Sequence, residues 1–93
     1  MTDQKYEELA DFFKLFTSVS RIQIVSALSK QSMSVSEIEK TVDLSQSLVS
    51  QQLKLLKNAR IVTSERAGKT VIYSLFDKHI IEILAIVLEH IEE

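Results

Sequence analysis

The only two histidines of the chain lie near its C-terminus, and a carboxylate accompanies each of them. Asp77 precedes His79 by two residues, and Glu93 follows His90 by three. At about 100° per residue the two histidines fall on one stripe of a helix, roughly 16 Å apart along its axis. One metal ion therefore could not bind both within a single chain. Imidazole nitrogens and carboxylate oxygens nevertheless form a tetrahedral ligand set for Zn(II), with Co(II) as a surrogate.

A two-fold symmetric dimer would complete such a site. When two copies of a helix pack antiparallel across a two-fold axis, residues meet wherever their numbers sum to a constant. His79 with His90 and Asp77 with Glu93 give nearly the same sum, so both pairs centre on residues 84–85. The spacing predicts two equivalent sites, each with Asp77 and His79 from one chain and His90 and Glu93 from the other. Helix capping by Asp77 and ordinary solvation of surface histidines are the alternative, and spacing alone does not decide between them.

The helix that would carry these groups, about residues 77–93, has two apolar stripes. One stripe is expected to be a core face of the protomer, because a single amphipathic helix needs only one such face. The other stripe has isoleucines between its two histidines, and we expect it to contact a partner helix. The core stripe comprises Ile80, Leu84, Val87, Leu88 and Ile91, and the partner stripe comprises His79, Ile83, Ile86, His90 and Glu93.

Length and composition indicate one small globular domain, residues 1–93, for which dimerisation would add buried surface. The chain is 45% hydrophobic and 26% charged, which is typical of a folded domain. The absence of cysteine excludes disulfides and thiolate metal sites. Without a long apolar run or a signal pattern, we expect a cytoplasmic protein that does not bind membranes. Without a nucleophile–base pair or a phosphate-binding loop, we expect neither enzymatic activity nor a small-molecule substrate.

Because the chain has no proline and only one glycine, Gly68, we expect mainly α-helices joined by short turns. A first helix is predicted for about residues 3–16, and its aromatic side chains would serve the core or a dimer contact. A second helix is predicted from residue 18 or 20 to about 29, and Arg21 on its outer side is expected to stay solvated rather than to reach a phosphate. The apolar positions are Leu9, Phe12, Phe13 and Phe16 in the first helix, and Ile22, Val25 and Leu28, expected to be buried, in the second.

A helix-turn-helix is predicted for about residues 35–59. Ser34 and Glu37 form a capping-box pattern that opens a short helix, and after a tight turn Ser45 caps a longer one. The second helix of such a motif enters the DNA major groove, where polar side chains hydrogen-bond base edges. The same pattern also occurs in helical proteins that never contact DNA. The candidate DNA-contacting residues on this helix are Gln46, Ser47, Ser50, Gln51, Lys54 and Lys57.

After this helix the hydrophobic period changes from helical to alternating. Two β-branched runs around Gly68, within residues 61–75, predict a β-hairpin, or wing. Arg66 and Lys69 lie near its tip, where they would contact phosphates or only aid solubility. Residues 44–75 carry a formal charge of +4, whereas the remainder carries −6. A basic surface on an acidic body is typical of a protein that binds double-stranded DNA at one face.

From about residue 12 to its end, the chain resembles the ArsR/SmtB-type metal-sensing transcriptional repressors, a family of homodimeric winged helix-turn-helix proteins. The resemblance is carried by residues 44–57, LSQSLVSQQLKLLK, and by residues 72–75, IYSL, at the end of the wing. The last helix adds a pattern similar to the intersubunit site of the zinc-sensing branch of the family. This pattern is Asp77-x-His79, ten further residues, and then His90-x-x-Glu93.

The resemblance implies a function and a partner. A zinc-free homodimer would bind a double-stranded operator with inverted-repeat symmetry, and Zn(II) at the dimer interface would lower DNA affinity and derepress metal efflux or resistance genes. Two positions depart from the family pattern, which often has proline before the arginine of the second helix, here Ser20 before Arg21, and a histidine in the recognition helix, here Gln51. A metal-independent winged-helix regulator and a helical protein-interaction adaptor remain the alternatives.

Overall fold

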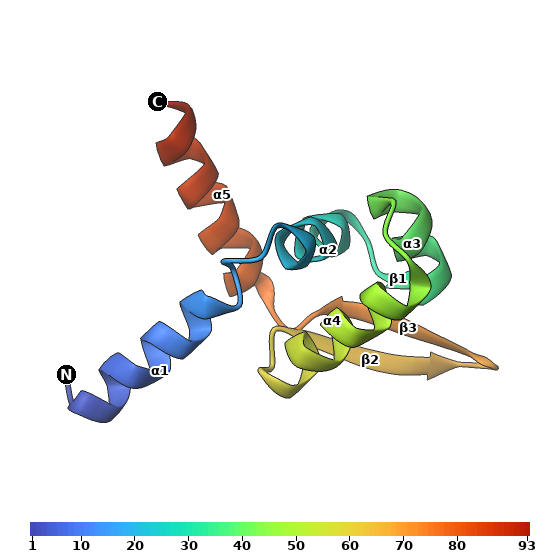
Figure 1. Ribbon diagram of the computed structural model, residues 1–93, viewed down its shortest axis with the longest axis horizontal. Helices are drawn as coiled ribbons and strands as arrows, with labels where there is room; N and C mark the ends of the chain where they lie inside the picture. Colours follow the sequence, from blue (N-terminus) through green and yellow to red (C-terminus); the bar gives the residue numbers. More distant parts are fainter.

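The computed structural model describes all residues from Met1 to Glu93. Five helices and three strands form a mainly α-helical domain in which α3 and α4 make the helix-turn-helix and β2 and β3 make the wing, as predicted (Figure 1). No helix combines the length and apolar character that a bilayer span requires. The bounds are α1 Asp3–Lys14, α2 Val19–Lys30, β1 Met33–Ser34, α3 Val35–Val42, α4 Gln46–Asn58, β2 Val62–Ala67, β3 Thr70–Leu75 and α5 Lys78–Glu92.

Side-chain caps set where the helices begin. Each helix is preceded by a residue whose side-chain oxygen accepts a backbone N–H of the first turn, which satisfies a donor that the helix itself leaves free. The capping box predicted for α3 is present, because the Glu37 carboxylate also accepts the backbone N–H of Ser34 at 2.9 Å. The five caps, in chain order, are Thr2, Ser18, Ser34, Ser45 and Asp77.

The wing belongs to a three-stranded antiparallel sheet with the order β1-β3-β2. Strands β2 and β3 form the predicted hairpin, closed by the pair Ala67 and Thr70, and Gly68 in the turn has a φ of 67° that favours glycine. Strand β1 is an addition to the predicted elements, and its Met33 pairs with Tyr73 of β3. Two residues are too few for an alternating pattern, so the sequence gives no sign of this strand.

The hydrophobic core lies where α2, α3 and α4 meet the sheet. Twelve buried apolar side chains form one cluster, and a set of half-buried apolar side chains packs against it. Helix α2 contributes four members and α4 contributes three, because both helices are covered on one side by the other elements. The cluster comprises Ile24, Val25, Ala27, Leu28, Met33, Ile38, Val49, Leu53, Leu56, Ile61, Val62 and Ile80.

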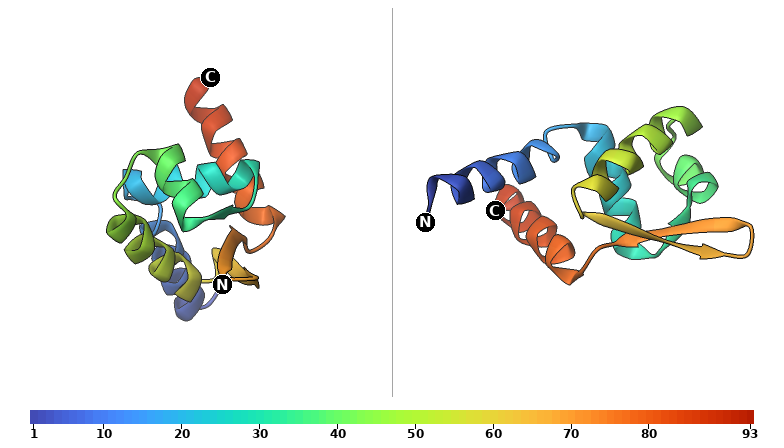
Figure 2. Two further views of the ribbon diagram at one scale, coloured as in Figure 1. Left: turned by 90° about the vertical axis from the view of Figure 1, so that its right-hand side faces the viewer. Right: turned by 90° about the horizontal axis from the view of Figure 1, so that it is seen from below.

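Helix α1 and all but the first turn of α5 lie outside this core. They leave the domain at the end opposite to the hairpin tip and diverge from each other (Figures 1 and 2). Helix α1 buries no residue, and α5 buries only Ile80. The prediction that the core stripe of α5 packs within the protomer is therefore wrong for its outer turns, since Val87 is 47% and Ile91 is 71% exposed. Ile22 of α2, predicted to be buried, is also 38% exposed.

Candidate nucleic-acid interface and metal site

Helix α4 turns its polar face to solvent. Its opposite side carries Val49, Leu53 and Leu56, which are buried in the core, so apolar packing decides which face of the helix is exposed. The hydroxyl of Ser45 accepts the backbone N–H of Leu48 at 3.2 Å and holds the first turn. Contact of this face with DNA stays a prediction. The six candidate residues on α4 are all exposed, namely Gln46, Ser47, Ser50, Gln51, Lys54 and Lys57.

The wing lies beside α4 and adds basic side chains to the same half of the domain. Helix α4 packs against β2, and Lys57 near the end of α4 donates to the hydroxyl of Ser64 in β2 at 2.6 Å. Arg66 and Lys69 are exposed near the hairpin turn. This arrangement offers hydrogen-bonding side chains on the helix and cations on the wing, the combination that reading bases and holding phosphates requires.

The four candidate metal ligands form two pairs at opposite ends of α5. At the first end, Oδ1 of Asp77 accepts the backbone N–H of His79 at 2.9 Å and lies 3.3 Å from His79 Nδ1. At the other end, Nδ1 of His90 lies 3.9 Å from Oε2 of Glu93. The side chains of His79, His90 and Glu93 are largely exposed, and that of Asp77 is 43% exposed. The protomer therefore brings together the two members of each pair, but it does not bring the two pairs together.

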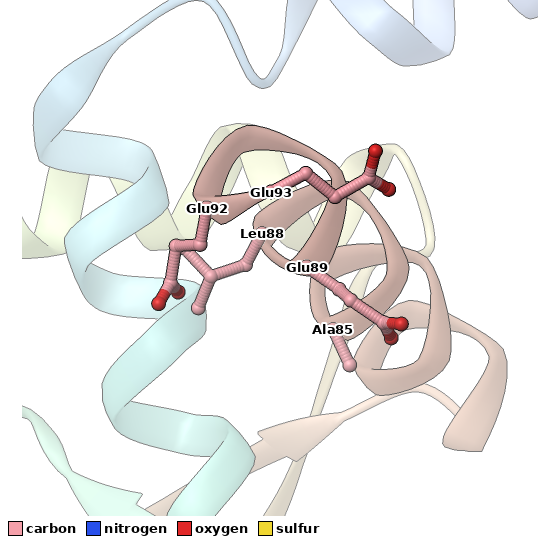
Figure 3. Close-up of a pocket in the computed structure, with 5 residues that line it drawn as sticks. All are labelled: Ala85, Leu88, Glu89, Glu92 and Glu93. Carbon is pink, nitrogen blue, oxygen red and sulfur yellow. The ribbon is translucent and has the colours of Figure 1, made fainter.

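The acidic end of α5 offers no complete metal site of its own. Figure 3 shows Glu89, Glu92 and Glu93 around the last turns of the helix, with their carboxylates pointing in different directions. No group of three or more metal-binding side chains converges anywhere in the chain. A complete set of four ligands would therefore need a second chain.

Arg21 makes hydrogen bonds within the protein that its sequence position did not predict. Its Nε donates to the Leu15 carbonyl at 2.8 Å, its Nη2 donates to the Lys14 carbonyl at 3.3 Å, and its Nη1 donates to Oε1 of Gln52 at 3.0 Å. The prediction that Arg21 stays solvated is wrong, because the end of α1 presents carbonyl groups that no helical N–H satisfies. Helix α1 also ends at Lys14 rather than near residue 16, and the Thr17 hydroxyl donates to the Lys14 carbonyl at 2.7 Å.

The sequence did contain a signal for this contact. Gln52 lies at helical spacing from Val49 and Leu56, and next to Leu53, so it belongs to the buried stripe of α4. It is the buried polar side chain of the domain, with 9% of its surface exposed. A polar side chain in an apolar stripe requires a hydrogen-bond partner, and Arg21 supplies one.

Comparison with known proteins extends these observations. The family model described as bacterial regulatory protein, arsR family, matches residues 18–64, from the cap of α2 into the wing. The transcriptional repressor SmtB homolog of Synechocystis sp. is 33% identical over 93 residues, which cover 100% of this chain and 70% of that protein.

Two solved structures share the fold. The crystal structure of Rv0081 from Mycobacterium tuberculosis has a TM-score of 0.91 and 34% sequence identity, and the match covers 98% of this chain and 92% of that one. The homodimeric winged helix-turn-helix DNA-binding domain Mb0332 from Mycobacterium bovis has a TM-score of 0.89 over 100% of this chain and 89% of that one. At 22% identity, the second likeness concerns the fold alone.

Proposed function

Because the chain belongs to the arsR family of bacterial regulatory proteins, which are DNA-binding transcription regulators and not enzymes, we propose that it is a zinc-responsive homodimeric repressor. The zinc-free dimer binds an inverted-repeat operator. Binding of Zn(II) between the two C-terminal helices lowers DNA affinity and derepresses metal efflux or resistance genes. The observation that carries this proposal is the pairing of one imidazole with one carboxylate at each end of α5.

A second copy of the chain is the partner that this function requires. The protomer has an apolar groove between α1, α2 and α5, and side chains such as Phe13 and Leu88 are 54% and 56% exposed there. Contiguous exposed apolar surface of this kind marks an interface. Ile83 belongs both to this groove and to the stripe that carries the two histidines. A symmetry mate that covers the groove and packs its own α5 antiparallel along that stripe would set each ligand pair against the other pair of its partner. The groove is lined by Phe13, Phe16, Ile22, Ile83, Leu84, Val87, Leu88 and Ile91.

The side chains at the two ends of α5 fit a zinc site chemically. One imidazole and one carboxylate from each chain give two nitrogen and two oxygen ligands, a set suited to tetrahedral Zn(II). Asp77 uses Oδ1 to cap the helix, which leaves its second oxygen for a metal contact. When bound, Zn(II) would supply a link between the two α5 helices at both ends of their contact.

Repression and its release follow from the distance between the two copies of α4. A dimer on an inverted repeat must place its recognition helices in successive major grooves, one helical turn of DNA apart. Two α5 helices held together by their ligand pairs would select a dimer with a different separation of the α4 helices. By linkage, DNA must lower the affinity for zinc by the same factor as zinc lowers the affinity for DNA.

The metal response is tested with a fluorescent duplex that the wild-type protein selects from a random-sequence pool. Fluorescence anisotropy should fall when Zn(II) is added to the wild-type complex, whereas His79→Ala and His90→Ala should keep the duplex bound. Glu89→Ala is the matched control, because Glu89 lies on the same helix outside the four-ligand pattern. An unchanged zinc response in both histidine variants would refute the site. Normal duplex binding without any zinc effect in the wild type would favour a metal-independent regulator, and no salt-sensitive duplex binding would favour a protein-interaction adaptor.

The dimer is tested separately by placing a charge in the groove. Val87→Glu should give a monomer in analytical ultracentrifugation, because an unpaired carboxylate would be buried at the interface. Ile81→Glu is the matched control, since Ile81 is 42% exposed on α5 and does not line the groove. A dimeric Val87→Glu variant would show that this groove is not the contact.

A further inference from the structure

The three hydrogen bonds of Arg21 join two elements that contribute to different surfaces. Arg21 lies in the first turn of α2, and two of its donors bind the carbonyls of Lys14 and Leu15 at the end of α1. Its third bond goes to Gln52, in the middle of α4. Helix α1 borders the apolar groove, whereas α4 carries the polar face of the helix-turn-helix. A single side chain thus links the helix that borders the apolar groove to the helix that carries the candidate DNA-contacting residues.

The chemistry of the contact makes arginine hard to replace. A guanidinium has five donors in a rigid planar fork and stays charged at every relevant pH, so it can bind three acceptors in three directions. The carbonyls at a helix end attract a cation as well as a donor. Gln52 must turn its oxygen towards Arg21, because arginine offers only donors. Lysine has one nitrogen at the end of a flexible chain and could not span the same three oxygens.

The link reaches the exposed face of α4 because Gln46–Asn58 form one continuous helix. Gln52 lies on the buried side of α4, and its neighbour Gln51 lies on the exposed side. The position of Gln52 is therefore coupled through the helix backbone to the positions of the exposed side chains. Few other contacts hold α1 against the domain, because α1 buries no residue. Phe12 of α1, together with Leu15 and Phe16 just after it, packs against the core.

We propose that Arg21 is a positioning residue that fixes the orientation of α4 relative to α1 through Gln52, and thereby sets the half-site spacing that the dimer accepts. The proposal rests on the proposed function, because it needs a DNA-bound dimer in which α1 contributes to the contact between the two copies. Three of the five donors of Arg21 bind protein oxygens, so the proposed role of Arg21 needs no contact between its side chain and DNA.

The test compares Arg21→Met with the wild type on the selected duplex and on duplexes with one or two base pairs inserted between the half-sites. Arg21→Met removes the three hydrogen bonds of the guanidinium, so we expect it to bind the parent duplex about tenfold more weakly than the wild type. The wild type should lose about tenfold or more on a one-base-pair insertion, whereas Arg21→Met should lose about threefold or less, because its recognition helices are less firmly placed. The dependence of affinity on salt should keep its slope, since no phosphate contact is removed.

Two further variants protect the test against a folding defect. Gln52→Leu removes the bond to α4 but keeps the contacts of Arg21 with α1, and it should reproduce the relaxed spacing preference. Gln52→Glu retains an acceptor for Arg21 and should keep the wild-type preference. Lys30→Met is the matched control, because Lys30 is an exposed cation at the other end of α2. Affinities are expressed per folded dimer, with the folded fraction measured by circular dichroism.

The possible results separate the two proposals. A wild-type protein that selects no duplex overturns both the proposed function and the role of Arg21. If the wild type binds and Arg21→Met or Gln52→Leu keeps its affinity per folded dimer and its spacing preference, only the positioning role fails. If a variant loses thermal stability but keeps its spacing preference, the positioning role is also overturned, because the contacts of Arg21 would then only stabilise the fold.

Discussion

The guanidinium of Arg60 lies over the ring of Phe76, with Cζ 5.0 Å from the ring centroid. Arg60 follows the end of α4 and has a φ of 62°, in the left-handed region. Phe76 directly precedes Asp77, the cap of α5, and its backbone N–H donates to the carbonyl of Ile61 at 2.8 Å. The stack and this hydrogen bond join the end of α4 to the start of α5, the helix that carries both candidate ligand pairs.

The left-handed backbone at Arg60 predicts an unusual order of stabilities. Arg60→Ala and Arg60→Gly both remove the stack on Phe76, but only glycine also relieves the strain of a positive φ. Arg60→Gly should therefore be more stable than Arg60→Ala by about 1 kcal/mol. Urea denaturation followed by circular dichroism measures the difference. Equal stabilities would mean that the backbone leaves the left-handed region when the arginine is removed.

Two neighbouring leucines of α4 should differ sharply in their contribution to stability. Leu56 is fully buried in the core, whereas Leu55 is 44% exposed. Leu56→Ala removes buried methyl groups and leaves a cavity, so it should lower the free energy of unfolding by about 2–5 kcal/mol. Leu55→Ala should lower it by less than about 1 kcal/mol in the protomer, since surface substitutions have small effects. Chemical denaturation at a concentration where the dimer does not form would expose the contrast, and comparable losses would contradict this packing.

The capping box predicts a pH dependence of stability. The backbone N–H and then the hydroxyl of Ser34 hold the pKa of Glu37 below its ordinary value of 4.5. A carboxyl whose pKa is lowered on folding stabilises the folded state above its unfolded pKa, and this contribution is lost as the pH falls through the lowered value. The free energy of unfolding of the wild type should thus decrease below about pH 4.5.

The comparison variant for this effect is Glu37→Gln. The amide cannot titrate, so the stability advantage of the wild type over Glu37→Gln should shrink as the pH falls below the ordinary value. Ser34→Ala removes the hydroxyl but keeps the backbone N–H, and it should weaken the pH dependence only in part. Denaturation curves recorded between neutral and acidic pH give the free energy of unfolding at each pH. A constant difference in this free energy between wild type and Glu37→Gln across the pH range would rule out the effect.

Two neighbouring positions on the exposed face of α4 should affect DNA binding differently. Gln51→Ala removes a side chain suited to a base edge, so it should lower discrimination against a changed base pair by about 1–3 kcal/mol. Lys54→Ala removes a cation, so it should weaken binding to all duplexes alike and reduce the salt slope by about one unit. Titrations of matched and mismatched duplexes at several salt concentrations separate the two effects. If Lys54→Ala instead altered base preference, the assignment of phosphate and base contacts would have to be exchanged.

The sequence was sufficient for the features that depend on neighbours along the chain. Capping side chains mark the starts of α3, α4 and α5, and the capping box at Ser34 and Glu37 forms as its spacing predicts. For α2 the sequence left the start open between residues 18 and 20, and the structure places the cap at Ser18. The change from helical to alternating period marks the wing, and Gly68 marks its turn. Capping and periodicity act over a few residues, so local sequence carries them. The pairing of each histidine with its carboxylate is local in the same way, whereas the meeting of the two pairs needs a second chain.

Only the tertiary structure decided which of the available apolar and polar groups find a partner within the protomer. The stripe of α5 that helical spacing assigns to the core extends past the other helices, so Val87 and Ile91 stay exposed and the groove remains open. Arg21 and Gln52 are 31 residues apart and meet because α2 and α4 pack together. Burial and long-range hydrogen bonds depend on which elements the fold places side by side, and no pattern within one helix contains that information.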